Sequence, residues 1–415
     1  MTSRERILAA IRHEQPDQVP VDFGATPSSG ISAIAYNNLK KYLNFDQHTT
    51  LVYDVVQQLA RPGKIIFDLY EIDVFDIERT FNTGDIYWHN VFLPDGSEAM
   101  YPAWFHPVKD EEGTWNVYDD ENVVIAKMPK SSTFFNQSHF PFLNGYPSDF
   151  NDLSKAMKKV MWSAMAICPW DHAHEPDFWE QLREKTLRLR EKTDKALIIG
   201  VGCNLFEWGT FLRRIDNFLM DLVMDTHNVE RLLDALMEIH LSILEKVCKA
   251  VGDVVDIIKF GDDLGMQNGP FMSPETYRKF FKPRHTLLCD YVKQNSRMFT
   301  YLHSCGSIYD LIPDLIEAGF EVLNPVQTNC RNMDPVRLKK EFGKDITFWG
   351  GGVDTASVLN HATPEKVREQ VLERLEIFSP GGGYVFNTIH NILPEVPPEN
   401  IVAMFEAVKE FNGQK

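Results

Sequence analysis

The stretch from Thr300 to Ile308 places an imidazole and a thiol two residues apart, where an apolar run ends in glycine. Thiolate and imidazole are preferred zinc ligands, so His303 and Cys305 can aim two donors at one ion. His390 follows a later apolar run and supplies a third donor, with Cys330 as a reserve ligand. Three protein ligands leave a fourth position open for a substrate, as catalytic zinc sites do. The pattern therefore predicts a catalytic zinc site.

The same pair of residues allows two other interpretations. A cysteine nucleophile with its histidine base has this composition, although no third orienting group stands at a recognisable spacing. A hydrogen-bonded histidine beside a buried cysteine is the structural alternative.

Further polar residues come directly after apolar runs and are assigned to the same site. Asp262 and Asp263 are either a general acid/base pair or caps for the loop that follows them. The residues predicted to act in catalysis are Asp262, Asp263 and Asp354, and those predicted to bind substrate are Glu207, Trp208, Gln327 and Asn391.

These residues need a scaffold that gathers strand ends in one place. From about residue 175, amphipathic helices alternate with short apolar strands, which indicates parallel βαβ units. The expected helices are 176–193, 214–251, 274–295, 308–318, 335–342, 364–378 and one from about 398, and the expected strands are 196–202, 254–260, 297–302, 321–323, 346–349 and 383–387. Two earlier candidates, 19–23 and 73–77, raise the strand count to eight, so we predict an α/β fold of the (β/α)8 TIM-barrel type.

In such a barrel, chemistry collects where the strands end. Residues 1–80 are expected to hold N-terminal helices and the first barrel strands, with a helical stretch over 31–80 broken at Pro62 and Gly63. Residues 81–150 are rich in aromatic and β-branched residues and turn signals, which predicts an inserted β-meander. Residues 151–415 are expected to complete the barrel.

Composition excludes several classes of function. The 415 residues carry 42 basic and 59 acidic side chains, a net charge of −17, which argues against nucleic acid as a partner. No apolar run approaches the roughly 20 residues of a membrane span. Six scattered cysteines and a charged, amphipathic N-terminus favour the cytoplasm.

Several segments together resemble the uroporphyrinogen decarboxylase superfamily, which includes methyltransferases that use cobalamin bound to a corrinoid protein. The likeness covers the N-terminus and most of 195–410, in the family's order. The segments are Arg4–Arg12, Asp17–Val21, Ile199–Gly202, Gly261–Asp263 with Ser273–Glu275, His303–Gly306, Gly350–Asp354 and Pro397–Ile401.

Within that superfamily the resemblance favours the corrinoid methyltransferases. The decarboxylases carry an arginine-rich segment after the first strand to bind the carboxylates of the tetrapyrrole, whereas Phe23–Ile31 contains no arginine. The methyltransferases bind zinc through a His-x-Cys pair, which His303 and Cys305 match, and a later cysteine. His390 stands in the place of that cysteine, and histidine also occupies this place in the decarboxylases.

The resemblance implies a zinc-dependent methyltransferase that moves a methyl group between a small substrate and the cobalt of a corrinoid protein. The substrate would be an aryl methyl ether, thiol or thioether, and the cobalamin would be carried by the partner. A metal-independent, decarboxylase-like lyase using Asp262 and His390 is the second hypothesis, and a non-catalytic small-molecule-binding barrel is the third. The methyl donor, the direction of transfer and the oligomeric state, a homodimer included, stay open.

Overall fold

The computed structural model describes residues 1–45 and 49–413. Within them, seven parallel strands form one sheet in the spatial order β16-β15-β14-β13-β12-β11-β4. Their order along the sheet follows their order along the chain, as in a barrel. The strands are β4 (Val74–Asp76), β11 (Ala196–Gly202), β12 (Ile257–Gly261), β13 (Phe299–His303), β14 (Val322–Asn324), β15 (Thr347–Trp349) and β16 (Tyr384–Val385).

An extended segment at Val21 lies between the two edges of this sheet. Val21 forms a parallel bridge with Phe386, and the amide of Phe386 donates to the carbonyl of Pro20 at 2.8 Å. On the other side, the amide of Asp73 donates to the carbonyl of Val21 at 2.9 Å. The segment therefore occupies the eighth position, and the predicted (β/α)8 barrel is confirmed. Its ladder stays short because Pro20 has no amide hydrogen to donate.

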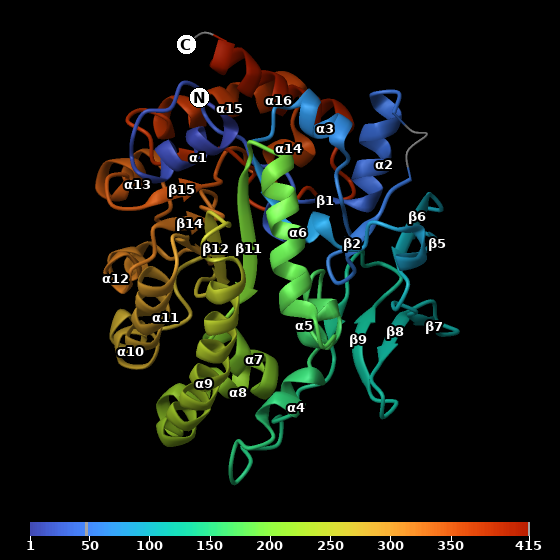
Figure 1. The fold of residues 1–415 in the computed structure, drawn as a ribbon, viewed down its shortest axis with the longest axis vertical. Helices are drawn as coiled ribbons and strands as arrows, with labels where there is room; N and C mark the ends of the chain where they lie inside the picture. Colours follow the sequence, from blue (N-terminus) through green and yellow to red (C-terminus); the bar gives the residue numbers. More distant parts are fainter. Residues whose placement is uncertain (46–48, 414–415) are drawn as a thin grey trace.

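Helices surround the sheet (Figure 1). Helices predicted at 335–342 and 364–378 match α13 (Pro335–Phe342) and α15 (Pro364–Phe378). The helices predicted over 214–251 are Ile215–Met224 and Thr226–Val251, and the Asp225 side chain between them caps the second one by accepting from the Asn228 amide. The helices are α1 (Ser3–Ile11), α2 (Ala33–Tyr42), α3 (Lys64–Leu69), α4 (Leu153–Lys158), α5 (Met161–Ala164), α6 (Phe178–Lys192), α7 (Phe206–Arg213), α8 (Ile215–Met224), α9 (Thr226–Val251), α10 (Pro274–Phe280), α11 (Lys282–Asn295), α12 (Ile312–Ala318), α13 (Pro335–Phe342), α14 (Val358–His361), α15 (Pro364–Phe378) and α16 (Pro398–Gly413).

The expectation of a mainly helical stretch over 31–80 is wrong. Between α2 and α3 the chain forms an antiparallel sheet of β1 (Ile31–Ser32), β3 (Leu59–Ala60) and β2 (Val52–Asp54), in that spatial order. The β-branched and aromatic residues around Val52 and Tyr53 favour extended backbone, and both side chains are buried.

Six strands lie in the range predicted as an insertion. A hairpin of β5 (Trp88–Phe92) and β6 (Glu98–Pro102) turns at Asp95 and Gly96, where glycine adopts φ +84°. A second sheet follows in the order β10-β9-β8-β7. Its strands are β7 (Val108–Lys109), β8 (Trp115–Tyr118), β9 (Val124–Met128) and β10 (Asn136–Gln137). Both sheets lie along one flank of the barrel (Figure 1).

The barrel interior is a packed apolar cluster that includes Ile257, Tyr301 and Val322, each fully buried. Side chains alternate along a strand, so the residues two positions further on point to the same interior. These residues are Lys259, His303 and Asn324, and they form the layer nearest the carboxyl ends of the strands.

The carboxyl ends of the strands open toward α7 and α8. In Figure 1 the arrow of β11 points to the end of the molecule where these two helices lie, opposite α1 and α16. Among the residues that the structure describes, no helix is both long enough and apolar enough to span a bilayer.

Candidate metal centre

The structure brings the three predicted metal ligands together. One donor atom from each of His303, Cys305 and His390 lies within 4.8 Å of the other two. The Cys305 Sγ is 3.4 Å from His303 Nε2, and the two imidazole rings are 5.7 Å apart at their centroids. His303 ends β13, Cys305 is the second residue of the loop after it, and His390 lies in the loop after β16.

The orientation of His303 is fixed by an asparagine on the neighbouring strand. The Asn324 side chain donates through Nδ2 to the Trp349 carbonyl at 2.8 Å, so its Oδ1 is an acceptor. That oxygen lies 2.6 Å from His303 Nδ1, which therefore carries the ring proton. The Nε2 lone pair then faces Cys305, which is the tautomer that a metal ligand requires.

The protonation states of the three ligands suit a cation. Burial lowers the pKa of His303 to about 3 and that of His390 to about 4, so both rings are neutral at physiological pH. Burial and the neighbouring carboxylates of Asp263 and Glu207 raise the pKa of the Cys305 thiol well above its ordinary value. A thiolate here consequently needs a positive charge beside it, and zinc supplies one. The donor set fits zinc.

Two carboxylates border the metal ligands. Asp263 Oδ1 accepts a hydrogen bond from the Cys305 amide at 2.8 Å and lies 3.6 Å from His303 Nε2. Glu207 accepts from the Asn204 side-chain amide. Burial raises the pKa of Asp263, and burial together with the Asp263 charge raises the pKa of Glu207 well above its ordinary value. Both groups are placed to hold or release a proton next to the metal ligands.

Asp262 has the capping role that its sequence position left open. It is fully buried, and its carboxylate accepts hydrogen bonds from three consecutive amides at 3.2, 3.0 and 2.8 Å, those of Leu205, Phe206 and Glu207. His285 Nε2 lies 3.3 Å away on the other side. These contacts fix the first turn of α7, and Asp262 meets His303 through its backbone, since its amide donates to the His303 carbonyl at 3.0 Å.

Gln327 and Asp354, the predicted site residues after the sixth and seventh strands, form hydrogen bonds that hold loops in place. Gln327 Oε1 accepts from the Gly306 amide at 2.8 Å and so positions the loop that carries Cys305. Asp354 accepts from Asn329 Nδ2 at 3.1 Å and from Ser357 Oγ at 2.6 Å, which closes its own turn.

Cys330 and Trp208, also predicted from the sequence, make contacts with residues other than the three ligands. Cys330, the reserve ligand, donates to Gln267 Oε1 at 3.4 Å and belongs to neither of the metal-binding groups in the described residues. Trp208 packs edge-on against Phe211, with ring centroids 5.8 Å apart. Trp208 therefore supports a residue that lines the site.

A cavity of about 540 Å³ opens above Asp263 and His390. Asn391 lines it as predicted, and the Asn391 side chain is fixed by a hydrogen bond to Gln57 Oε1 at 2.9 Å. Arg214 is the one guanidinium among its lining residues, and it is paired with Asp216 at 2.5 Å. Aromatic rings form much of the wall, namely Phe134, Phe135, Phe140, Trp162 and Phe211. A small apolar or aromatic molecule fits such a cavity.

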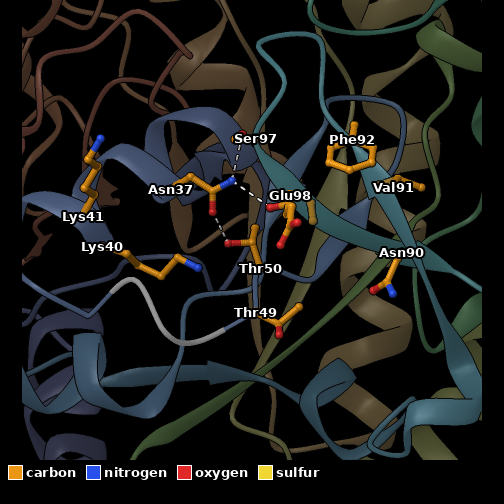
Figure 2. Close-up of a pocket in the computed structure, with 11 residues that line it drawn as sticks. Asn37, Lys40, Lys41, Thr49, Thr50, Asn90, Val91, Phe92, Ser97 and Glu98 are labelled. Atoms are coloured by element: carbon orange, nitrogen blue, oxygen red, sulfur yellow. Dashed lines mark hydrogen bonds between the residues drawn. The ribbon is translucent and has the colours of Figure 1, made fainter.

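A larger hollow of about 750 Å³ lies between α2 and the β5–β6 hairpin (Figure 2). Its polar groups bond to one another: the Asn37 side chain donates to Ser97 Oγ and to the Glu98 carbonyl, both at 3.0 Å. None of its lining residues belongs to a metal-binding group. Size alone therefore does not make this hollow the functional site.

Sequence reasoning missed one residue of the site, Lys259, and assigned no role to Asn324. Lys259 faces the barrel interior near Asp76, Glu207 and Asp263, and burial lowers its pKa. Strand alternation alone signals the position of Lys259, because a lysine two residues after Ile257 in an apolar strand must share its interior face.

A family model described as Uroporphyrinogen decarboxylase (URO-D) matches residues 177–411, which is more than half of the chain. The chain belongs to the uroporphyrinogen decarboxylase family. This matched range includes every strand from β11 to β16 and all three candidate metal ligands of this URO-D chain.

Curated URO-D relatives match shorter stretches. The uroporphyrinogen decarboxylase of Pseudoalteromonas translucida is 46% identical over 76 residues, 18% of this chain and 21% of its own length. That of Geotalea daltonii is 26% identical over 242 residues, 55% of this chain and 64% of its own length. The matched stretches thus span less than two-thirds of each of these relatives.

Among solved structures, a methyltransferase from Methanosarcina mazei is similar over 99% of both chains, with a TM-score of 0.58 and 19% sequence identity. At this identity the similarity establishes a shared fold. The shared fold includes the N-terminal region that the family model does not match.

Proposed function

We propose that this URO-D family member is a zinc-dependent methyltransferase that moves a methyl group between a small methylated substrate and the cobalt of a corrinoid protein. The observation that carries the proposal is the convergence of His303, Cys305 and His390 at one end of an apolar cavity. Two imidazoles and a thiolate hold zinc with a position open for substrate. The aromatic wall favours an aryl methyl ether over a charged substrate.

In this proposal, the residues around the metal ligands have separate roles. Bound zinc would act as a Lewis acid on the oxygen or sulfur that carries the methyl group. Asn324 holds His303 in the ligating tautomer, and Gln327 holds the Cys305 loop through the Gly306 amide. Asp263 borders both the ligands and the cavity, so it can give a proton to the demethylated oxygen or sulfur, or take one in the reverse direction.

The corrinoid partner and the cytoplasmic location are parts of the same proposal. Six free cysteines in the described structure suit a reducing compartment.

The second candidate is a decarboxylase, which the names of the curated relatives favour. Decarboxylation of a tetrapyrrole that carries many carboxylates needs several cations around the substrate. The cavity above His390 offers Arg214, already paired with Asp216, and otherwise mostly apolar and amide groups. The charge of this cavity supports the methyltransferase proposal.

The test supplies zinc-loaded protein with free cob(I)alamin and a set of methoxybenzenes and methylated thiols, and follows methylcobalamin by absorbance. We expect methyl transfer that is lost in Cys305→Ala and retained in Cys248→Ala, a buried cysteine on α9. Carbon dioxide release from uroporphyrinogen, with no methyl transfer in either direction, would overturn the proposal.

A further inference from the structure

A second group of metal-binding side chains lies just before α6. One donor atom from each of Cys168, Asp171 and His172 lies within 4.8 Å of the other two. Asp171 and His172 belong to a single 3-10 turn, Trp170–His172, so the chain presents all three from five consecutive residues. Cys168 is 6% exposed and hydrogen-bonds only weakly, to the Glu78 carbonyl at 3.6 Å.

One oxygen of this group is buried without a partner. The Asp171 side chain is 9% exposed, and its Oδ1 has no hydrogen bond. The other oxygen, Oδ2, accepts from Asn82 Nδ2 at 3.0 Å and from Trp104 Nε1 at 3.3 Å. These two bonds fix the carboxylate so that Oδ1 lies 3.7 Å from His172 Nε2. An unsatisfied buried carboxylate oxygen is costly, and a bound cation removes the cost.

The hydrogen bonds of His172 identify a fourth donor. Its Nδ1 lies 2.6 Å from Glu175 Oε1, and its Nε2 lies 2.6 Å from Asn82 Oδ1. Because Asn82 Nδ2 already donates to Asp171, Asn82 Oδ1 is the atom that faces His172 Nε2, and it is an acceptor. If the Nε2 proton leaves, Nε2 and Asn82 Oδ1 both face the group with free lone pairs.

We propose that Cys168, Asp171, His172 and Asn82 bind a second divalent cation of zinc type. Thiolate and imidazole with two oxygens satisfy its preference for four mixed ligands. The cation would take Cys168 as a thiolate and His172 as a neutral imidazole, so its binding releases the thiol proton to solvent. A neighbouring cavity of about 400 Å³, lined by Asn82, Asp171 and His172, gives the ion a path.

The position of this group indicates a structural role. Asn82 follows β4, Trp104 follows β6, and the turn at Trp170 donates to the Gly200 carbonyl of β11 at 2.7 Å. A cation at this point would tie the segment after β4, through Asn82, to the turn before α6, and Trp104 would be held there through its hydrogen bond to Asp171. Burial and the charge of Asp171 raise the pKa of the Cys168 thiol.

The experiment uses the full chain with the first site removed by Cys305→Ala, so it does not depend on the proposed function. We expect the wild type to hold about two zinc ions, Cys305→Ala about one, and Cys305→Ala with Cys168→Ser none. Cobalt(II) in Cys305→Ala should show a thiolate-to-cobalt charge-transfer band that disappears in Cys168→Ser. Cys248→Ser, a cysteine of similar exposure, serves as the control.

Thermal stability gives a second readout of cation binding. Zinc should raise the melting temperature of Cys305→Ala, and the rise should be absent when Asp171→Asn is added, a change that keeps the shape of the side chain. A folded Cys305→Ala protein that holds no zinc, or one that keeps its zinc and its cobalt band after Cys168→Ser, would overturn the proposal.

Discussion

The Oδ1 of Asn324 lies 2.6 Å from the Nδ1 of His303, on the strand next to it. The same asparagine accepts from Ser28 Oγ at 2.8 Å and donates to the Trp349 carbonyl, so its side-chain amide is fixed in one orientation. Three parts of the barrel therefore determine which nitrogen of His303 faces Cys305. The barrel itself therefore holds His303 in the orientation and tautomer that a metal ligand needs.

Removing this acceptor should weaken zinc binding at His303. Asn324→Leu should lower zinc affinity by about 10- to 100-fold, because the ring loses its fixed tautomer and orientation. Asn324→Asp keeps an acceptor for His303 and should bind zinc nearly as well as the wild type. Chelator competition in a Cys168→Ser background measures this site alone, and equal affinity of the Leu variant and the wild type would refute the orienting role.

Substitution of Asp262 should mainly lower stability, whereas substitution of the neighbouring Asp263 should mainly lower activity. Asp262→Asn should lower the free energy of unfolding by about 2–3 kcal/mol, because an amide group replaces one acceptor of the α7 amides. The Asp263 side chain is 36% exposed, and Asp263→Asn should cost below about 1 kcal/mol while lowering methyl transfer. Urea unfolding of the metal-free proteins checks the stabilities. An Asp262→Asn protein of unchanged stability and no activity would restore its catalytic assignment.

The buried His240 on α9 should make stability depend on pH. Its Nε2 donates to the Asn204 carbonyl at 2.9 Å, and burial lowers its pKa from 6.5 to about 4. Between these pH values the unfolded chain takes up a proton that the folded chain refuses, so the free energy of unfolding falls as pH decreases from 6.5 to 4. The loss from this group is about 3 kcal/mol and is complete near pH 4.

His240→Gln isolates this contribution, since glutamine does not titrate. Urea unfolding of the metal-free proteins across that pH range should give a shallower pH dependence for the variant, by about one proton. Parallel curves for the two proteins would show that His240 does not cause the loss.

Local pattern predicted the scaffold of the site well. Helix periodicity located α13 and α15, and the strand ends placed His303, Cys305 and His390 at one mouth. Their meeting follows from a barrel, because its parallel strands all end at the same side.

The roles of several residues depend on contacts with distant parts of the chain, which the sequence pattern could not predict. Asp262 is a cap because α7, which begins more than fifty residues earlier in the chain, presents its first amides to the carboxylate. Cys330 has the right chemistry for a ligand, but its loop turns the thiol to Gln267. The role of Asn324 depends on the register of β13 with β14, which no local pattern contains.

The aromatic wall of the cavity should determine which methylated substrate is used. Trp162 is 40% exposed and packs on Phe211 with ring centroids 6.0 Å apart, so its free face is available to a substrate ring. Trp162→Ala should raise the KM for an aryl methyl ether about 10-fold, because one aromatic contact is worth about 0.5–1.5 kcal/mol beyond the area it buries. A small methylated thiol, which cannot stack, should show a much smaller change.

A matched surface variant and a conservative one complete this test. Phe92→Ala removes an exposed ring beside the larger hollow (Figure 2) and should leave KM unchanged. Trp162→Phe keeps an aromatic face and should restore most of the affinity. Equal increases in KM for Trp162→Ala and Phe92→Ala, or equal increases in the KM for the ether and for the thiol, would mean that the aromatic wall does not contact a substrate ring. The methyl donor would then be a small aliphatic compound.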